Sequence, residues 1–227
     1  MKFERTDTWG FDHSLHGMRN PLASWDRSDS YLLSPNDDDF SKRGGYFIGE
    51  NDMKLAQRLI KAGPEHRKFL RQIFVSVDIT APVFWFKEFS TYKVGTVENS
   101  TSTMHCLSTT PITMECFECG DLVEDLLVYD NEPYNENATF GELFEHYIEI
   151  LETLRQRYLE TKDKRYWKEL VRALPESWLQ TRTITMNYEI IRNIVKQRTG
   201  HKLTEWKTFI DWAHTLPYAD ELIFYEL

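Results

Sequence analysis

Two polar stretches of the chain contain the residue types that bind ligands. The first, residues 88–105, is dense in Ser and Thr side chains and includes Asn99 and Gly95. Hydroxyls and loop N–H groups donate well to phosphate oxygens, and a glycine lets the backbone approach a ligand. So many polar groups would be costly in an apolar core. They therefore form either exposed, hydrogen-bonded turns or the wall of a polar ligand site.

The second stretch, residues 187–198, has the spacing of a helix. Asn187 and Arg198 fall on or beside one apolar stripe. That stripe consists of Ile190, Ile191, Ile194 and Val195. A buried Arg or Asn must be paired, or it costs several kcal/mol. The partner is either a bound ligand or an internal carboxylate from the 36 acidic residues of the chain.

The elements that must position these stretches follow from periodicity. Residues 73–79 alternate apolar and polar and predict a strand. After Ala81-Pro82, the aromatic residues 83–89 predict a short buried helix. Asn51 or Asp52 caps a helix that ends at Gly63-Pro64. Further helices are predicted at 140–161, 164–174, 184–197 and 203–216.

The remaining segments have no sustained period. Residues 1–48 form an irregular, aromatic-rich N-terminal segment that packs on the domain, with a loop at 34–39. Residues 120–137 are acidic and turn-rich. Neither a repeat nor a linker interrupts the chain, so the pattern predicts one α+β domain over residues 1–227.

Composition narrows the partners. The 227 residues carry a formal net charge of −9, which repels a phosphate backbone and argues against duplex nucleic acid. No apolar run has the length of a membrane span, and the N-terminus lacks a signal-peptide core. Three cysteines do not make a disulfide framework, and together these features favour the cytoplasm.

Metal sites are weakly indicated. Cys116 and Cys119 form a single C-x-x-C, with Cys106 and His105 upstream, so four zinc ligands are available in principle. A second C-x-x-C or a spaced His pair is missing, and we predict no metal. The run Asp37 to Asp39 lacks the spacing of a calcium loop. No Walker or Rossmann glycine motif is present.

Read with their flanks, the two polar stretches resemble the flavin-dependent thymidylate synthases, the ThyX family. The similarity extends from about His66 to Met104 and from Leu174 to about Trp206. The family's strand, its Ala-Pro dipeptide and its aromatic helix match Ala81-Pro82 and the neighbouring residues. The resemblance implies an antiparallel sheet packed with a bundle of long helices.

The resemblance also assigns residues. Asn187 and Asn193 match the two asparagines that contact flavin in the family, and Arg198 matches the catalytic arginine that reaches the pyrimidine. His66 falls where the family has a histidine near its flavin, and His201 matches another flavin-side histidine one position out of register. The remaining flavin-side positions implied are Lys68, Thr91, Tyr92, Lys93 and Asn99. The substrate positions implied, besides Arg198, are Glu88, Ser100, Thr101, Ser102 and Thr103.

The chain departs from the family at its charged contacts. Thr91-Tyr92-Lys93 stands in place of Arg-His-Arg, Glu88 replaces a Gln, and Thr103 replaces an Arg in the nucleotide loop. Losing two charge-assisted contacts at about 1.5–3 kcal/mol each weakens a phosphorylated ligand by about two to four decades. Lys93 recovers part of this as a point charge. Either the site holds a different ligand, or Arg67, Lys68 or Arg182 compensates.

The resemblance therefore implies a flavoprotein. The activity implied is that of an FAD-dependent methyltransferase, which transfers a one-carbon unit reductively to a pyrimidine deoxynucleotide such as dUMP. NADPH and a folate donor are further cofactors implied, and the family's assembly is a homotetramer. The alternative is a ThyX-fold module that binds nucleotide or flavin without synthase activity. A modified-nucleotide enzyme with another one-carbon acceptor lies between the two.

Overall fold

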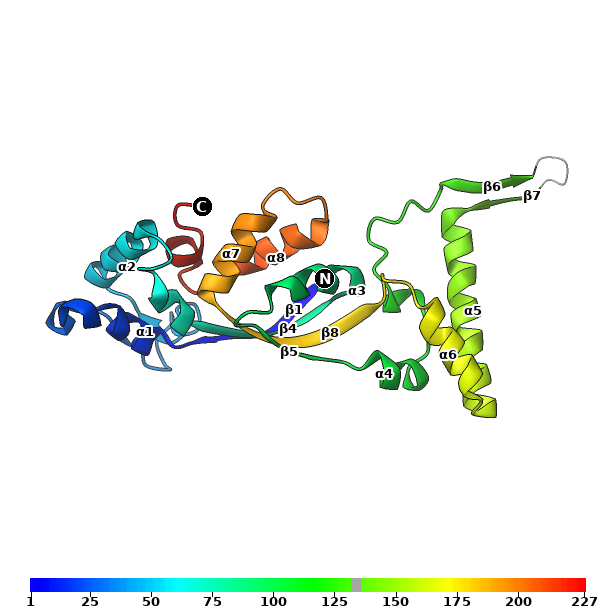
Figure 1. The fold of residues 1–227 in the computed structure, drawn as a ribbon, viewed down its shortest axis with the longest axis horizontal. Coiled ribbons are helices and arrows are strands. Elements are labelled where there is room, and N and C mark those ends of the chain that lie inside the picture. Colours follow the sequence, from blue (N-terminus) through cyan, green and yellow to red (C-terminus); the bar gives the residue numbers. More distant parts are fainter. Residues whose placement is uncertain (132–135) are drawn as a thin grey trace. The chain divides into compact units, whose positions relative to one another are not determined.

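The computed structural model describes residues 1–131 and 136–227 (Figure 1). The chain forms two compact units. Unit 1 comprises residues 1–79, 89–99 and 182–227, and unit 2 comprises residues 80–88 and 100–181. Two strands, β4 (Phe74–Pro82) and β8 (Leu179–Asn187), contain boundaries between the units. The prediction that residues 1–227 form a single domain stays a prediction.

The main sheet has four strands in the order β1 (Lys2–Trp9), β4, β8 and β5 (Val97–Ser100). Within unit 1, Ser76 Oγ lies 3.1 Å from Thr185 Oγ1, and Thr183 Oγ1 donates to Asp78 Oδ1 at 2.5 Å. The partner numbers fall on one strand as they rise on the other, so β4 and β8 are antiparallel. The predictions of an α+β fold with an antiparallel sheet, and of a strand at 73–79, are confirmed.

The prediction that residues 1–48 are irregular is wrong. Besides β1 they contain α1 (Phe11–Met18), short 3-10 turns, and the antiparallel pair β2 (Tyr31–Leu32) and β3 (Tyr46–Phe47). The sequence hides β1 because it is an edge strand: its residues KFERTDTW are mostly polar and exposed, so no apolar alternation marks it. The segment does pack on unit 1, where Phe11 and Leu15 are buried.

Two helix boundaries in unit 1 differ from the prediction. The helix expected at 184–197 is α7 (Tyr188–Arg198), and residues 184–187 end β8 instead. Alternating Thr and Ile side chains at 183–185 favour the extended strand there. The helix after residue 50 is α2 (Glu50–Ala62), and neither Asn51 nor Asp52 caps it. The Asp29 carboxylate accepts from both of their N–H groups instead, at 2.9 and 3.1 Å.

Three more helical elements complete the frame of unit 1. The predicted helix at 203–216 is α8 (Thr204–His214), and a π-helical turn, η7 (Ala219–Ile223), follows it. A 3-10 turn, η3 (Lys68–Gln72), precedes β4. The aromatic helix α3 (Val83–Phe89), with Trp85, Phe86 and Phe89 fully buried, is also confirmed. Most of α3 belongs to unit 2.

Unit 2 contains α4 (Thr103–Thr109), α5 (Phe140–Thr161) and α6 (Lys164–Ala173). The predictions of the latter two helices are confirmed, and they pack against each other (Figure 1). A capping box between Thr139 and Glu142 starts α5. The 120–137 stretch contains the antiparallel strands β6 (Leu127–Asn131) and β7 (Glu136–Thr139), while its residues 132–135 lie outside the described residues.

The two units differ in how they bury apolar surface. In unit 2 one cluster holds the elements together, and it includes Leu107, Phe117, Leu151, Leu170 and Trp178. In unit 1 the buried side chains come from the sheet and from helices including α7 and α8, among them Val75, Val77, Ile191 and Phe209. None of the helices in the described part of the chain combines the length and apolar character that a bilayer span requires.

Candidate functional site

A cavity of about 560 Å³ lies in unit 1 between the start of α7 and the turn before β5; we call it cavity A. Its wall combines amide, hydroxyl and apolar side chains. The lining residues are Arg71, Thr91, Tyr92, Val94, Gly95, Asn187, Glu189, Ile190, Asn193 and Gln197. All of them belong to unit 1, so the cavity depends on no contact between the units.

Asn187 is fixed at the mouth of α7 because it caps that helix. Its side-chain oxygen accepts from the Ile190 N–H at 3.1 Å, and the residue is 8% exposed. The amide nitrogen then points toward Gly95, whose φ is +79°. A Cβ on Gly95 would lie 2.9 Å from Ile190 Cδ1 and 3.8 Å from Asn187 Nδ2. Glycine therefore keeps this part of the wall open.

Asn193 lies on the face of α7 that lines the cavity, one turn beyond Ile190. Within the described part of the chain its side chain makes no hydrogen bond, although it is only partly exposed. An amide in this position can both donate to and accept from a ligand. Asn187 and Asn193 together thus present amide groups to the same cavity.

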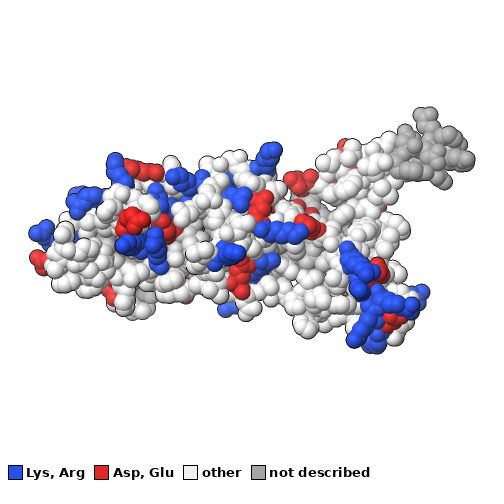
Figure 2. Space-filling view, viewed as in Figure 1, with Lys and Arg blue, Asp and Glu red and all other residues white. Residues whose placement is uncertain are grey.

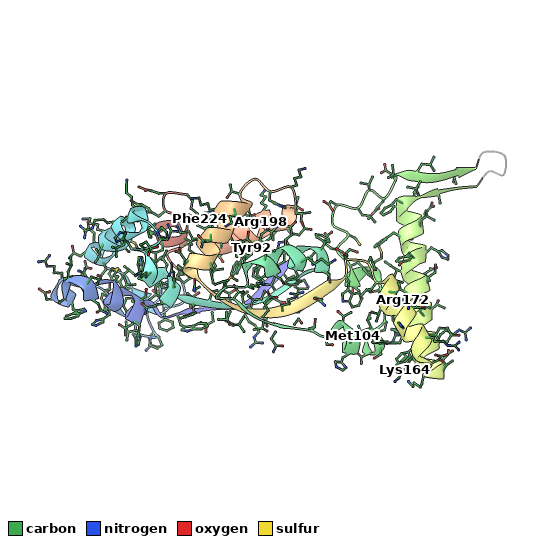
Figure 3. The ribbon with its side chains drawn as sticks, viewed as in Figure 1. Tyr92, Met104, Lys164, Arg172, Arg198 and Phe224 are labelled. Atoms are coloured by element: carbon green, nitrogen blue, oxygen red, sulfur yellow. The ribbon has the colours of Figure 1, made fainter. Side chains whose placement is uncertain are left out.

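Arg198 is fixed next to cavity A, although it does not line it. Its Nε donates to Tyr92 Oη at 2.9 Å, and Tyr92 Oη donates to Gln197 Oε1 at 3.1 Å. The guanidinium also lies 4.5 Å from the ring centroid of Trp206, within cation–π range. Figure 3 shows Arg198 and Tyr92 next to each other. The positive charge of Arg198 is therefore held next to the hydroxyl of Tyr92, a residue that lines cavity A.

The carboxylate in the wall is neutralised from behind. Arg67 Nε donates to both oxygens of Glu189, at 2.9 and 3.2 Å, and Glu189 is 6% exposed. Nearby, buried Arg192 donates to the carbonyls of Ile223 and Tyr225 at 2.7 Å. Burial, and then the charge of Arg67, lower the pKa of Arg192 below its ordinary value, while Glu189 opposes this shift. Both arginines thus have partners inside the protein: Arg67 pairs with Glu189, and Arg192 bonds to two backbone carbonyls.

Of the flavin-side residues predicted from the sequence, the structure brings four together in cavity A: Thr91, Tyr92, Asn187 and Asn193. The others lie elsewhere in unit 1. His66 and Lys68 line a second cavity, and Lys93 and Asn99 are exposed side chains outside the lining of cavity A. His201 Nδ1 accepts from the Leu203 N–H at 3.2 Å, with its ring near Trp206.

The predicted substrate residues Glu88, Ser100, Thr101, Ser102 and Thr103 belong to unit 2. There Thr101 continues the pairing with β8: its N–H donates to Thr181 O at 2.9 Å, and its hydroxyl accepts from Thr181 N–H at 3.3 Å. Thr103 Oγ1 accepts from Gln180 Nε2 at 2.6 Å. Thr101 and Thr103 thus use their hydroxyls on strand β8, where the sequence predicted contacts with a phosphate.

Two of the three cations expected to compensate for the lost arginines are paired with carboxylates. Arg67 holds Glu189, and Arg182 Nη1 donates to Glu98 Oε2 at 2.6 Å and to Ser90 Oγ at 3.3 Å. Both belong to unit 1. The structure instead places a cation that the sequence analysis missed, Arg71, at the exposed edge of cavity A.

Gln197 is a further lining residue that the sequence analysis missed, and a signal for it exists. Asn187, Ile190, Asn193 and Gln197 are three or four positions apart and form one face. The stripe predicted from the sequence instead consisted of Ile190, Ile191, Ile194 and Val195, with Asn187 and Arg198 on or beside it. The cavity face shares Asn187 and Ile190 with that stripe, and it continues through Asn193 and Gln197 where the stripe continues through Ile194 and Arg198.

The cysteines give no sign of a metal centre. In residues 1–131 and 136–227, no three His, Cys, Asp or Glu side chains are arranged to hold a metal ion. Cys116 and Cys119 are half-buried against the apolar cluster of unit 2. Burial, aided by nearby Glu118 and Glu124, raises the pKa of the Cys119 thiol, so this thiol is less reactive than an ordinary one.

Together these features define an α+β protein with a cavity lined by amide and hydroxyl side chains, and with Arg198 bonded to the lining residue Tyr92. Comparison with solved structures gives the fold a name. The chain is similar to the flavin-dependent thymidylate synthase ThyX of Helicobacter pylori, crystallised with FAD and dUMP: 18% identity, 98% of each chain covered and a TM-score of 0.64. It therefore has the ThyX fold.

A second relative by structure is the UMP/dUMP methylase PolB of Streptomyces cacaoi, crystallised with 5-Br dUMP. It has 14% identity and a TM-score of 0.56, with 97% of this chain and 93% of PolB covered. No family model and no curated protein matches the sequence. At these identities the comparisons establish the fold alone.

Proposed function

We propose that this protein is a ThyX-like flavoprotein that acts on a pyrimidine nucleotide. The observation that carries the proposal is cavity A. Four residues assigned to flavin from the sequence, Thr91, Tyr92, Asn187 and Asn193, converge on it within one unit. The fold in which they converge covers 98% of an enzyme crystallised with FAD and dUMP. Convergence on one cavity of residues that the resemblance assigned to one ligand supports a ligand site.

The lining of cavity A fits part of a flavin. Its volume of about 560 Å³ falls within the range of small-molecule sites. Val94 and Ile190 offer apolar contact to a ring face, while Asn187 and Asn193 offer amides to the heteroatoms at a ring edge. Arg71 at the rim is a partner for a phosphate. When bound, the reduced flavin would supply hydride equivalents.

The role proposed for Arg198 is to polarise the pyrimidine. Its guanidinium is held by Tyr92 Oη and Trp206, so it needs little reorganisation when charge develops on a base carbonyl. Reductive one-carbon transfer of the thymidylate-synthase type, with NADPH and a folate donor, belongs to this proposal. So do a homotetrameric assembly and a cytoplasmic location.

A second candidate function is a ThyX-fold module that binds flavin or nucleotide without synthase activity. A specific observation favours it: Thr101 and Thr103 bond to strand β8, and Arg182 is paired with Glu98. These groups would have to leave their partners to hold a nucleotide phosphate. Both functions share the ligand chemistry of cavity A and differ in turnover.

The first test is flavin binding. The purified, untagged chain should be yellow, or should become so on reconstitution with FAD, and titration should quench flavin fluorescence. Asn193→Leu removes an amide from the wall and should weaken FAD at least about tenfold. Lys196→Leu, on the exposed face of the same helix, is the matched control and should bind as the wild type does. A colourless protein that FAD cannot reconstitute would refute the proposed function.

The second test separates the two candidates. If the protein is a synthase, Arg198→Ala should lower dUMP affinity by at least about tenfold, since a charge-assisted contact is lost. Arg198→Lys should recover only part of it, because lysine lacks the planar fork. The wild type should also complement a thymidine auxotroph. FAD binding without complementation or conversion of dUMP would favour the binding module.

A further inference from the structure

A second and larger cavity lies in unit 1, and we call it cavity B. It encloses about 720 Å³ between the end of α1, the turns at residues 20–27, α2 and the segment at 65–72. One part of its wall is apolar. That part includes Met18, Pro21, Leu22, Leu55, Leu59 and Phe69. Such a surface suits a ring or a hydrocarbon portion of a ligand.

The rest of the wall is strongly basic. Arg27, Lys54, Arg58 and Lys68 all line the cavity, together with His66. Among the described residues of the lining, Glu65 supplies the one carboxylate. Lys54 is tied to Glu50, but within the described residues no ion pair involves Arg27, Arg58 or Lys68. These cations are gathered in a chain whose net charge is −9.

Figure 2 shows several Lys and Arg side chains over the α1–α2 end of unit 1, with Asp and Glu side chains among them. An unpaired group of like charges is destabilising when nothing compensates it. A ligand with several oxyanion oxygens provides that compensation through charge-assisted hydrogen bonds. The composition of the wall thus points to a ligand that has both an anionic part and an apolar part.

The wall is rigidly supported from behind. The Asp52 carboxylate is fully buried, and it accepts from Arg19 Nε at 2.5 Å and from the hydroxyls of Ser28 and Ser30 at 2.6 Å. Arg19 also donates to the carbonyls of Ser24 and Arg27 at 3.3 and 3.1 Å. This network ties α1, the 24–30 loop and α2 together. Arg19 is therefore structural, and the remaining cations are the ones available to a ligand.

We propose that cavity B is a binding site for an organic phosphate of nucleotide size, separate from cavity A. Arg58 and Lys68 hold the phosphate groups, and Leu55, Leu59 and Phe69 contact the ring portion. His66 and Lys68, which the sequence assigned to flavin, serve this site instead. The proposal does not rest on the flavin assignment, because the two cavities have separate linings.

The probe for this site is ADP, which combines a ring system with a diphosphate. Titration calorimetry on the full chain compares ADP with adenosine, which lacks the anion, and with inorganic pyrophosphate, which lacks the ring. ADP should bind more tightly than either, and raising the salt concentration should weaken it. If ADP fails to bind, or if pyrophosphate or adenosine binds as tightly as ADP does, the proposal is overturned.

Variants test whether ADP binds in cavity B. The double variant Arg58→Glu/Lys68→Glu removes two charge-assisted contacts and should weaken ADP by at least about a hundredfold. Lys207→Glu, an exposed lysine on α8, makes the same kind of charge change elsewhere in unit 1 and should leave the affinity unchanged. Asn193→Leu, in cavity A, should lower FAD binding but not ADP binding. Both exchanged side chains are exposed, and circular dichroism checks that the double variant folds.

These results distinguish a failure of the cavity B proposal from a failure of the proposed function. Unchanged ADP affinity in the folded Arg58→Glu/Lys68→Glu variant refutes cavity B as the site, whatever FAD does. Loss of ADP binding in Asn193→Leu would place ADP in cavity A and would also refute it. If the protein binds ADP as described but does not bind FAD, cavity B stands as the ADP site and the proposed flavoprotein function is refuted.

Discussion

Cavities A and B each have a buried ion pair in the wall or next to it. They differ in the other side chains that could contact a ligand. The ion pair is Arg67 with Glu189 in cavity A, and Arg19 with Asp52 in cavity B. The member that lines the cavity is the acid in A and the base in B. Because both are neutralised by a partner, neither decides which ligand is bound. Ligand preference comes from the groups that remain.

Those remaining groups are of opposite kinds. Cavity A presents the amides of Asn187 and Asn193 and one cation at its edge, so it suits a largely neutral heterocycle. Cavity B presents several cations around an apolar wall, so it suits an anion with a ring. A single segment, residues 65–72, contributes to both, with Arg71 in A and Lys68 in B. Neighbours in sequence therefore do not have to serve the same site.

The largest effect is expected from removing the charge that supports cavity B. Asp52→Asn keeps the size of the side chain but leaves Arg19 buried without its counter-charge. Breaking a buried pair from one side costs about 3–5 kcal/mol. The free energy of unfolding, measured by urea titration, should fall by that amount, and ADP binding should weaken with it.

The comparison also predicts which ligand keeps its affinity in the Asp52→Asn variant. In conditions where Asp52→Asn still folds, FAD affinity at cavity A should stay close to the wild-type value, because its support is the separate Arg67–Glu189 pair. An equal loss of FAD and ADP binding would show that the two cavities are not independent. A loss of stability under about 1 kcal/mol would contradict the structural role of Asp52.

The corresponding change behind cavity A is Glu189→Gln. Arg67 is 16% exposed, so part of its charge can be hydrated, and the expected loss is about 1.5–3 kcal/mol, smaller than at Asp52. The double variant Arg67→Met/Glu189→Leu removes both charges and should be more stable than Glu189→Gln, since an apolar pair leaves no charge unpaired. Urea titration of both variants measures this. A double variant less stable than the single one would contradict the pairing.

The sequence predicted the part of the fold that carries strong periodicity. The helices at 140–161 and 164–174 and the strand at 73–79 have regular apolar spacing, and the structure has them close to those bounds. The strand β1 was not predicted, because an exposed edge strand has no apolar face and therefore shows no apolar alternation in the sequence. The prediction extended α7 into β8, because Ile184 and Met186 continue an apolar pattern that fits either element.

The same limit applies to the candidate sites. The resemblance assigned both Asn187 and Asn193 to flavin, and helical spacing placed Asn187 beside the apolar stripe. That His66 and Arg71 line different cavities depends on the path of η3 and on packing against α1, which no local pattern records. The pairing of Arg182 with Glu98 is likewise a long-range contact that residue types alone could not select from many acids.

A smaller effect is expected from substitutions of Asn187, which lines cavity A and caps α7. Asn187→Ala removes the cap of α7, which costs about 1 kcal/mol of stability, and it also removes an amide from the wall. Asn187→Ser should restore most of the stability, since serine caps helices well, but not the amide contact. FAD affinity should therefore stay low in both variants while the urea midpoint recovers in the serine variant. Recovery of both would mean that Asn187 acts only as a cap.

The smallest effect concerns cavity B and depends on pH. Burial alone would raise the pKa of Asp29, but hydrogen bonds from the N–H groups of Asn51 and Asp52, helped by the charge of Arg19, outweigh it and lower the pKa below 3.8. A lowered folded-state pKa means that the stabilisation is fully present above 3.8 and is lost as the pH falls below it. Asp29→Ala should cost about 0.3–1 kcal/mol at neutral pH.

At neutral pH the variant should also bind ADP slightly more weakly, because Asn51 and Lys54 line cavity B in the first turns of α2, the helix end that Asp29 holds. As the pH is lowered from 3.8 through the folded-state pKa of Asp29, the wild type should lose this advantage, and the two unfolding free energies should converge. Asp38→Ala, in the exposed turn at 34–39, is the control and should follow the wild type at every pH. A difference between Asp29→Ala and wild type that grows in acid would have the wrong sign for a carboxylate that is stabilised in its charged form, and would remove Asp29 from the support of cavity B.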